Sequence, residues 1–328
     1  MHDSHEQNSR FIVRFNLFRN PPVLSIPSLI AAPKIFVVFA LCAISILMAS
    51  TAPTASARTL GEILKSGELR VCLSVSPGIV DATPEGCQDD CVFNGPAWEE
   101  SVAFAASLGP KIKLTTKRIE WNENFQNAKG VVDKMGGYTP KLLADGTCDI
   151  LPSHLTKNSW RENMMDFVTL FPSRMMVVIA KTNKGNIKRI TDLAGLTAAV
   201  QANSSYHTWL LQQNTGIFSS NPVKLKLMTT ADALDAVDKG VVDFSMKDAD
   251  GAIWITKHRY KQSVVAFPVG PTDEIGWGFA RSHLDLQMRV AKFFEQQFAH
   301  SNSDLNVMWV RQYGMSLNEY ITIIELVQ

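Results

Sequence analysis

Cysteine is the residue type in this sequence whose spacing says most about chemistry. Beyond an N-terminal apolar run there are four, Cys72, Cys87, Cys91 and Cys148. Cys87 and Cys91 lie close together in PEGCQDDC and can close a small ring, whereas Cys72 and Cys148 each lie at a predicted strand. In an exported chain we favour two disulfides, Cys72–Cys148 and Cys87–Cys91. The alternative is a zinc site on two thiols with Asp89, Asp90 or a histidine, but no second close Cys or His pair follows.

Catalytic signatures are missing from the sequence. It contains no H-E-x-x-H, no G-x-S-x-G and no G-x-x-x-x-G-K. The stretch DADG at 248–251 begins like a calcium loop but lacks the later glutamate. We therefore predict no metal, no cofactor and no catalytic activity.

The segment KIFVVFALCAISILMASTAPTASA at 34–57 predicts export. Its apolar run, Ile35–Met48, is shorter than the roughly 20 residues that a spanning helix needs. Small residues then lead to an A-x-A cleavage pattern that ends at Ala57. Because Cys42 lies inside the apolar run and not at its end, we expect no lipid anchor and a periplasmic mature protein. An uncleaved membrane anchor is the alternative. Residues 1–33 resemble either a long basic n-region or a segment upstream of the start that is used, and they are excluded from fold reasoning with the signal.

Charge and length bound the class of protein. The whole chain has a formal net charge of +1, and loss of residues 1–57 would remove four basic and two acidic residues to give −1. This balance gives no reason to expect nucleic acid or anionic lipid as a partner. The remaining chain, about 270 residues, suits one large or two medium domains.

Strands and helices alternate through the first part of the mature chain, which predicts a parallel sheet covered by helices. We expect strands at 69–74, 111–119, 148–151 and 175–180, and helices at 98–108 and 122–145.

The alternation then restarts, which indicates a second lobe of similar design. Ligands in such sheets bind at the carboxyl ends of strands. Thr230 is the expected N-cap of the helix at 230–239. We expect strands at 197–201, 223–228, 241–246 and 264–269, and helices at 204–213, 230–239, 249–258, 285–299 and 303–313.

Five segments in order carry a family resemblance: GELRVCLS, LLADGTCDILPSHLTKNSWRENMMDFVTLF, ITDLAGLTAAVQANSSYHTWL, ALDAVDKGVVDFSMKDADGA and IGWGFARSHLDLQMRVAKFFEQ. The chain resembles periplasmic solute-binding proteins of family 3, the polar amino-acid receptors of ABC importers. The resemblance implies an α/β fold with two lobes (type II), an interlobe ligand cleft and two hinge crossovers. It places lobe 1 at 58–181 plus 274–328 and lobe 2 at 182–273.

Two charged positions match the family's ligand clamp. Arg161 matches the arginine that holds the ligand's α-carboxylate, where a guanidinium forms two parallel hydrogen bonds that lysine cannot copy. Asp248 matches the acid that pairs with the α-ammonium. Ligand would favour the closed lobes by completing both pairings. Without the resemblance, both residues would be interpreted as solvated surface charges.

Further ligand contacts are expected around this clamp. His154 and Thr156 fall where the family uses small hydroxyl residues, so His154 is a departure. Ser204 and Ser205 open a helix and either contact an anion or cap the helix. Trp121 is expected at the floor of the cleft. Trp160 is interpreted as packing, and Ser76-Pro77-Gly78 stands where the family has an aromatic residue.

The resemblance implies a monomeric receptor that captures an amino acid or small carboxylate and delivers it to an inner-membrane ABC permease. Two alternatives stay open. One is an accessory protein of a periplasmic quinoprotein dehydrogenase, which can share cysteines resembling LRVC and GTCD. The other is a dehydratase on the same scaffold, with a general acid such as His154 near Arg161.

Overall fold

The computed structural model describes residues 56–281 and 283–326. The predicted export signal therefore lies outside the described residues except for Ser56 and Ala57, and the extension 1–33 lies outside them entirely. Within these described ranges, no helix is both long and apolar enough to cross a membrane.

A single eight-stranded mixed sheet, with strand order β4-β1-β5-β10-β6-β9-β7-β8, passes through the described chain, and β2 and β3 form a separate hairpin. The strands are β1 Glu68–Ser74, β2 Asp81–Thr83, β3 Val92–Asn94, β4 Lys113–Ile119, β5 Ile150–Lys157, β6 Asp166–Ala180, β7 Thr197–Val200, β8 Lys224–Leu227, β9 Phe244–Asp248 and β10 Ser263–Phe279.

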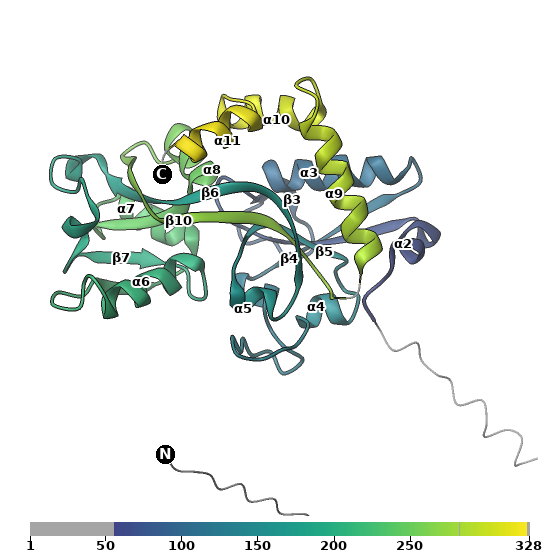
Figure 1. The fold of residues 1–328 in the computed structure, drawn as a ribbon, viewed down its shortest axis with the longest axis horizontal. Helices are drawn as coiled ribbons and strands as arrows, with labels where there is room; N and C mark the ends of the chain where they lie inside the picture. Colours follow the sequence, from purple (N-terminus) through teal and green to yellow (C-terminus); the bar gives the residue numbers. More distant parts are fainter. Residues whose placement is uncertain (1–55, 282, 327–328) are drawn as a thin grey trace, which may run out of the picture. The chain divides into compact units, whose positions relative to one another are not determined.

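Two long antiparallel strands, β6 and β10, lie side by side and join the two halves of the sheet (Figure 1). The end of β10 pairs with β5, and the end of β6 pairs with β9. Strands β4, β1 and β5 therefore belong to one half, which we call lobe 1, and β9, β7 and β8 to the other, lobe 2. The exact lobe boundaries, expected at 181/182 and 273/274, stay a prediction.

The prediction of a parallel sheet was wrong in part. The β1–β4, β1–β5, β7–β8 and β7–β9 pairs are parallel, but β5–β10, β6–β10 and β6–β9 are antiparallel. Only the ends of the two long strands were predicted as strands, at 175–180 and 264–269. Pro172 and Pro268 lie inside them and conceal their length, since proline normally marks a strand edge or bulge.

Helices cover both lobes. They are α2 Leu60–Ser66, α3 Pro96–Leu108, α4 Lys141–Ala144, α5 Ser159–Glu162, α6 Ser205–Thr215, α7 Thr230–Asp238, α8 Ala249–His258, α9 Leu284–Phe298, α10 Asp304–Tyr313 and α11 Leu317–Leu326, with short 3₁₀ turns at Trp121–Asn124, Lys181–Asn183 and Ile190–Leu193. The N-cap of α7 is Thr229, whose side chain accepts from the Asp232 N–H, and not the predicted Thr230.

The predicted helix at 122–145 was wrong. The chain forms only the turn Trp121–Asn124 and the short α4, with irregular backbone between them. The Asn127 side chain accepts hydrogen bonds from the backbone N–H groups of Lys129 and Val131. Such side-chain bonding competes with helix formation, and Pro140 and the glycines of this stretch add to the effect.

Each lobe has its own apolar core. In lobe 1, Phe104 and Trp277 pack edge to face with ring centroids 5.9 Å apart, and both are fully buried. In lobe 2, Val177, Trp209 and Phe244 belong to one buried cluster. These cores fix the strand ends that meet between the lobes.

The cysteines pair as the sequence analysis favours. Cys72 and Cys148 form a disulfide with Cα atoms 5.7 Å apart, and Cys87 and Cys91 form another with Cα atoms 5.2 Å apart. The first lies in a buried cluster and ties β1 to the start of β5, which are neighbouring strands. The second closes the loop between β2 and β3.

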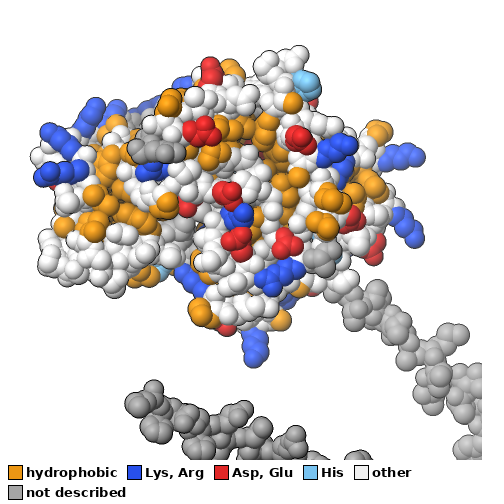
Figure 2. Space-filling view, in the orientation of Figure 1, with side chains coloured by type: hydrophobic (Ala, Val, Ile, Leu, Met, Phe, Trp, Pro, Cys, Tyr) orange, Lys and Arg blue, Asp and Glu red, His pale blue; other side chains and the backbone are white. Residues whose placement is uncertain are grey.

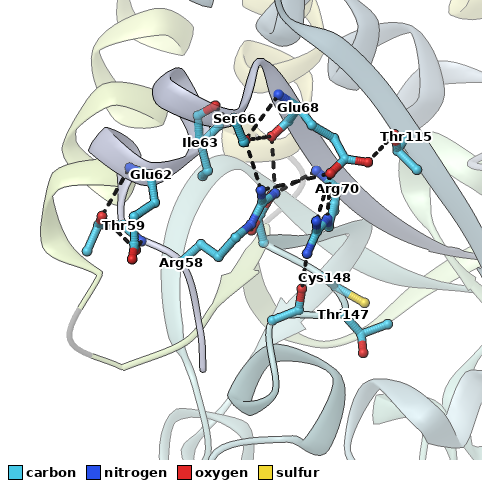
Figure 3. Close-up of polar contacts among 12 residues, drawn as sticks. Arg58, Thr59, Glu62, Ile63, Ser66, Glu68, Arg70, Thr115, Thr147 and Cys148 are labelled. Carbon is cyan, nitrogen blue, oxygen red and sulfur yellow. Dashed lines mark hydrogen bonds and ion pairs between the residues drawn. The ribbon is translucent and has the colours of Figure 1, made fainter. Parts of the chain in front are cut away.

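Arg58, the expected first residue after signal cleavage, is held by several contacts (Figure 3). Its Nη1 donates to Ser66 Oγ at 3.1 Å and its Nη2 to the Glu68 carbonyl at 3.1 Å. Its Nε donates to Asp149 Oδ1 at 2.9 Å, and the Asp149 side chain is fully buried. Arg58 is thus attached to α2, to β1 and to the residue that follows Cys148.

Candidate functional site

A polar pocket of about 30 Å³ lies between the lobes. We call it the cleft pocket. One water needs roughly 10–15 Å³ of such space, so an amino acid enters only when the lobes or their side chains move apart. The predicted ligand residues among those that line it are Trp121, His154, Thr156, Ser204, Ser205 and Asp248.

Arg161 does not line the cleft pocket but contacts residues that do. It is fully buried on α5, whose N-cap is Asn158. Its Nη1 donates to the carbonyl of Thr156 at 2.6 Å, while Nε and Nη2 have no hydrogen-bond partner among the described residues. Burial lowers the pKa of Arg161 to about 10, so the group stays charged at pH 7. A buried cation with free donors is suited to hold an anion.

Aromatic rings surround this guanidinium. Its Cζ lies 5.5 Å from the ring centroid of Trp121, 4.8 Å from that of Phe125 and 5.1 Å from that of Trp160. Such contacts favour the cation in a dry environment and fix its orientation. The interpretation of Trp160 as ordinary packing was therefore incomplete, because its ring lies against the predicted clamp.

Asp248 lies on the opposite side, at the end of β9 and the start of α8. Its backbone N–H donates to Tyr206 Oη at 2.9 Å, and its Oδ1 has no hydrogen-bond partner among the described residues. Burial, and next the charge of Asp250, raise the pKa of Asp248 to about 7, although Lys247 opposes them. The carboxyl group is thus poised to ionise when a cation approaches.

His154 is held by two carboxylates. Its Nε2 lies 2.8 Å from Glu100 Oε2 and its Nδ1 lies 3.2 Å from Asp250 Oδ2. Burial favours the neutral imidazole, but Glu100 and Asp250 outweigh burial and raise the pKa of His154 to about 10. Both ring nitrogens already have carboxylate partners, so neither is available for a hydrogen bond to a ligand. Nothing in the sequence near His154 indicated these distant partners.

The predicted hydroxyl contacts take different roles. Ser204 caps α6, since its Oγ accepts from the His207 N–H at 3.1 Å, so the capping alternative describes it here. Thr156 Oγ1 and Ser205 Oγ lie 3.2 Å apart and join the lobes. A ligand between the lobes would meet both hydroxyls.

Lys247 was missed by sequence reasoning. It is buried, lines the cleft pocket and donates from Nζ to Ser76 Oγ at 2.6 Å across the cleft. Burial lowers the pKa of Lys247, opposed by Asp248 and Asp250. The only signal in the sequence was the segment 76–78, which has no aromatic residue where the resembled family has one.

A second cavity of about 620 Å³ adjoins the cleft pocket and shares Trp121 and Gln201 with it. The β2–β3 hairpin forms part of its wall, and Arg118 there donates to the Cys87 carbonyl at 2.6 Å. Its volume falls within the roughly 300–1,000 Å³ of small-molecule sites.

Figure 2 shows acidic and basic side chains intermixed on the face in view. No group of three or more His, Cys, Asp or Glu side chains placed to hold a metal occurs in the described part of the chain.

Two α/β lobes joined by two long strands, with a polar pocket between them, define the type II periplasmic-binding fold that the resemblance implied. Solved structures of this fold match the chain. An ArgBP variant from T. maritima is 18% identical, with a TM-score of 0.61 over 78% of this chain and 99% of that one.

Two further structures give similar values. The ancestral amino acid-binding protein AncCDT-1, a precursor of cyclohexadienyl dehydratase, is 19% identical with a TM-score of 0.60 over 77% of this chain and 99% of that one. An ABC uptake transporter substrate binding protein from Streptococcus pneumoniae with bound histidine is 14% identical with a TM-score of 0.62 over 78% and 96%. No protein-family model and no curated protein matches the chain. At these identities the similarity establishes the fold.

Proposed function

We propose that this protein is an extracytoplasmic receptor that binds a small zwitterion, in the first place an amino acid, between its lobes for an ABC importer. The observation that carries the proposal is that two buried side chains of opposite charge each keep atoms without a hydrogen-bond partner. Arg161 keeps two nitrogens without partners, and Asp248 keeps one oxygen without a partner. A carboxylate and an ammonium on one ligand would complete both.

Similar proteins support the choice of ligand class. Solved structures with this fold include one described as an arginine-binding ancestor bound to arginine and one with bound histidine. The proposal includes export to the periplasm, delivery to an inner-membrane permease, action as a monomer and no catalytic step. It also keeps 58–181 with 274–328 as lobe 1 and 182–273 as lobe 2.

Lobe closure follows from the same geometry. Thr156 and Ser205 already touch across the cleft, and Asn203 Nδ2 donates to Asn122 Oδ1 at 3.1 Å. A ligand that contacts both lobes favours the closed state by its additional contacts there.

Isothermal titration calorimetry of the purified protein against the common amino acids and small carboxylates tests the proposal. We expect at least one amino acid to bind, Arg161→Ala to abolish binding and Asp248→Asn to weaken it. Arg189→Ala is the matched control, because Arg189 is an exposed arginine. Unchanged binding by a folded Arg161→Ala variant would contradict the clamp. Failure of the folded wild type to bind any compound would favour the accessory role.

A further inference from the structure

We propose that Lys247 and Ser76 form a second anion-binding subsite of the cleft pocket, so that the ligand is an acidic amino acid of the aspartate or glutamate type. This inference rests on the proposed function and narrows it to amino acids that carry a second anionic group.

The ammonium of Lys247 makes no direct ion pair with a described residue, although the charges of Asp248 and Asp250 act on it from farther away. Its Nζ bonds to the neutral hydroxyl of Ser76, and no carboxylate of the described residues lies within ion-pair distance of it. Only 3% of Lys247 is exposed, so water does little to compensate its charge. A buried cation without an anionic partner is costly, and an arriving anion would relieve that cost.

The other buried charges near the pocket are already engaged. His154 lies between Glu100 and Asp250 and binds both. In the neighbouring cavity, Asp81 Oδ1 lies 3.6 Å from Arg259 Nη1. These groups pair with one another, and Asp248 is the carboxylate that lines the cleft pocket itself.

The charges left for a ligand are therefore two cations and one anion. Arg161 and Lys247 have only neutral hydrogen-bond partners, and Asp248 has an acceptor oxygen without a donor. Asp273 is influenced by Arg161 and Arg174 and does not line the pocket. A ligand that pairs with all three carries two carboxylates and one ammonium, which describes an acidic amino acid.

Ser76 adds a second donor to the subsite. Its Oγ accepts the hydrogen bond from Lys247, so its own proton is free to donate to an anion. An ammonium and a hydroxyl could then share the two oxygens of one carboxylate. Ser76 lies in the segment where the family resemblance would place an aromatic residue. A ligand would therefore meet a hydroxyl group there and not an aromatic ring.

The fold holds Lys247 in position. Its aliphatic chain crosses Gly251 in the first turn of α8, where a Cβ would collide with Lys247 Cε. Gly78 in turn lies close to Gly251, since a Cβ at Gly78 would be 3.1 Å from the Gly251 carbonyl oxygen. The absence of side chains at both positions lets the Ser76 loop approach α8 and lets Lys247 reach it.

Calorimetry with L-aspartate, L-glutamate, L-asparagine and L-glutamine tests the inference on the purified full-length protein. We expect an acidic amino acid to bind at least roughly tenfold more tightly than its amide, because a charge-assisted contact is about twice as strong as a neutral one in a dry site. Lys247→Met should remove that preference by weakening the binding of the acidic amino acids roughly tenfold more than that of their amides, since both kinds of ligand keep the Arg161 and Asp248 contacts.

Two further variants accompany this test. Ser76→Ala removes one donor without touching a charge and should reduce the preference for acidic amino acids partly. Lys226→Met changes an exposed lysine on β8 and should change nothing. Thermal unfolding of each variant establishes that it is folded.

The outcomes separate the inference from the proposed function. If amino acids bind in an Arg161-dependent way without preference for acidic ones, the function stands and the subsite is refuted. If a folded Lys247→Met variant keeps the acidic preference, the subsite is also refuted. If no amino acid binds to the folded wild type, both proposals fail.

Discussion

Nε2 of His154 lies 2.8 Å from Oε2 of Glu100, and both side chains are almost fully excluded from solvent. Asp250, at the start of α8, completes the arrangement from the other side of the ring. The three side chains come from β5, α3 and α8, so one imidazole connects three elements that lie far apart in the sequence.

This relationship predicts a pH-dependent stability. The folded pKa of His154, about 10, exceeds its ordinary value of 6.5. Its stabilisation is therefore fully present below pH 6.5 and is lost as pH rises towards 10. We expect the free energy of unfolding, measured in urea, to fall across this window in the wild type.

The variant His154→Gln should show a smaller decrease over the same window and lower stability at pH 6. The control is His300→Gln, because His300 is exposed, and its profile should follow the wild type. A His154→Gln profile parallel to the wild type from pH 6.5 to 10 would rule out a protonated His154.

Ligand affinity should depend on the ionisation of Asp248. Its pKa of about 7 means that much of the carboxyl group is neutral in mildly acidic solution. An ammonium requires the ionised form, so the dissociation constant should rise roughly tenfold for each pH unit below 6. Calorimetry between pH 5 and 8 measures this. Asp248→Asn should weaken binding and flatten the profile, whereas Asp273→Asn should retain the pH dependence.

Arg161→Lys tests geometry separately from charge. The guanidinium has two nitrogens without partners and one bond to Thr156, which a single ammonium cannot reproduce. We expect at least about tenfold weaker ligand binding, corresponding to roughly 1.4 kcal/mol. Arg189→Lys at the surface serves as the control. Wild-type affinity in Arg161→Lys would show that the fork geometry is not used.

The two disulfides should contribute unequally to stability. The Cys72–Cys148 bond spans 76 positions and the Cys87–Cys91 bond spans 4. Loop-closure entropy predicts losses of about 4.5 kcal/mol and about 2 kcal/mol when each pair is replaced by alanine. Urea unfolding of the two double variants measures both. Equal losses would indicate that native packing, rather than the unfolded chain, dominates.

The sequence by itself located the elements with strong local signals. Apolar periodicity and end signals placed α3, α6, α8 and the short strands β1, β7 and β8 close to their observed bounds. The family resemblance, and not the local pattern, singled out Arg161 and Asp248, which without it would be interpreted as surface charges. The role of these two residues stays a proposal.

Only the tertiary structure decided what depends on distant partners. The antiparallel pairing of β6 with β10 joins segments about a hundred residues apart, and no local pattern encodes it. His154 finds Glu100 and Asp250 at separations of 54 and 96 residues, and Lys247 meets Ser76 across 171. Local periodicity reports which face of an element is buried, whereas the partner of a buried charge is fixed only when the lobes are folded against each other.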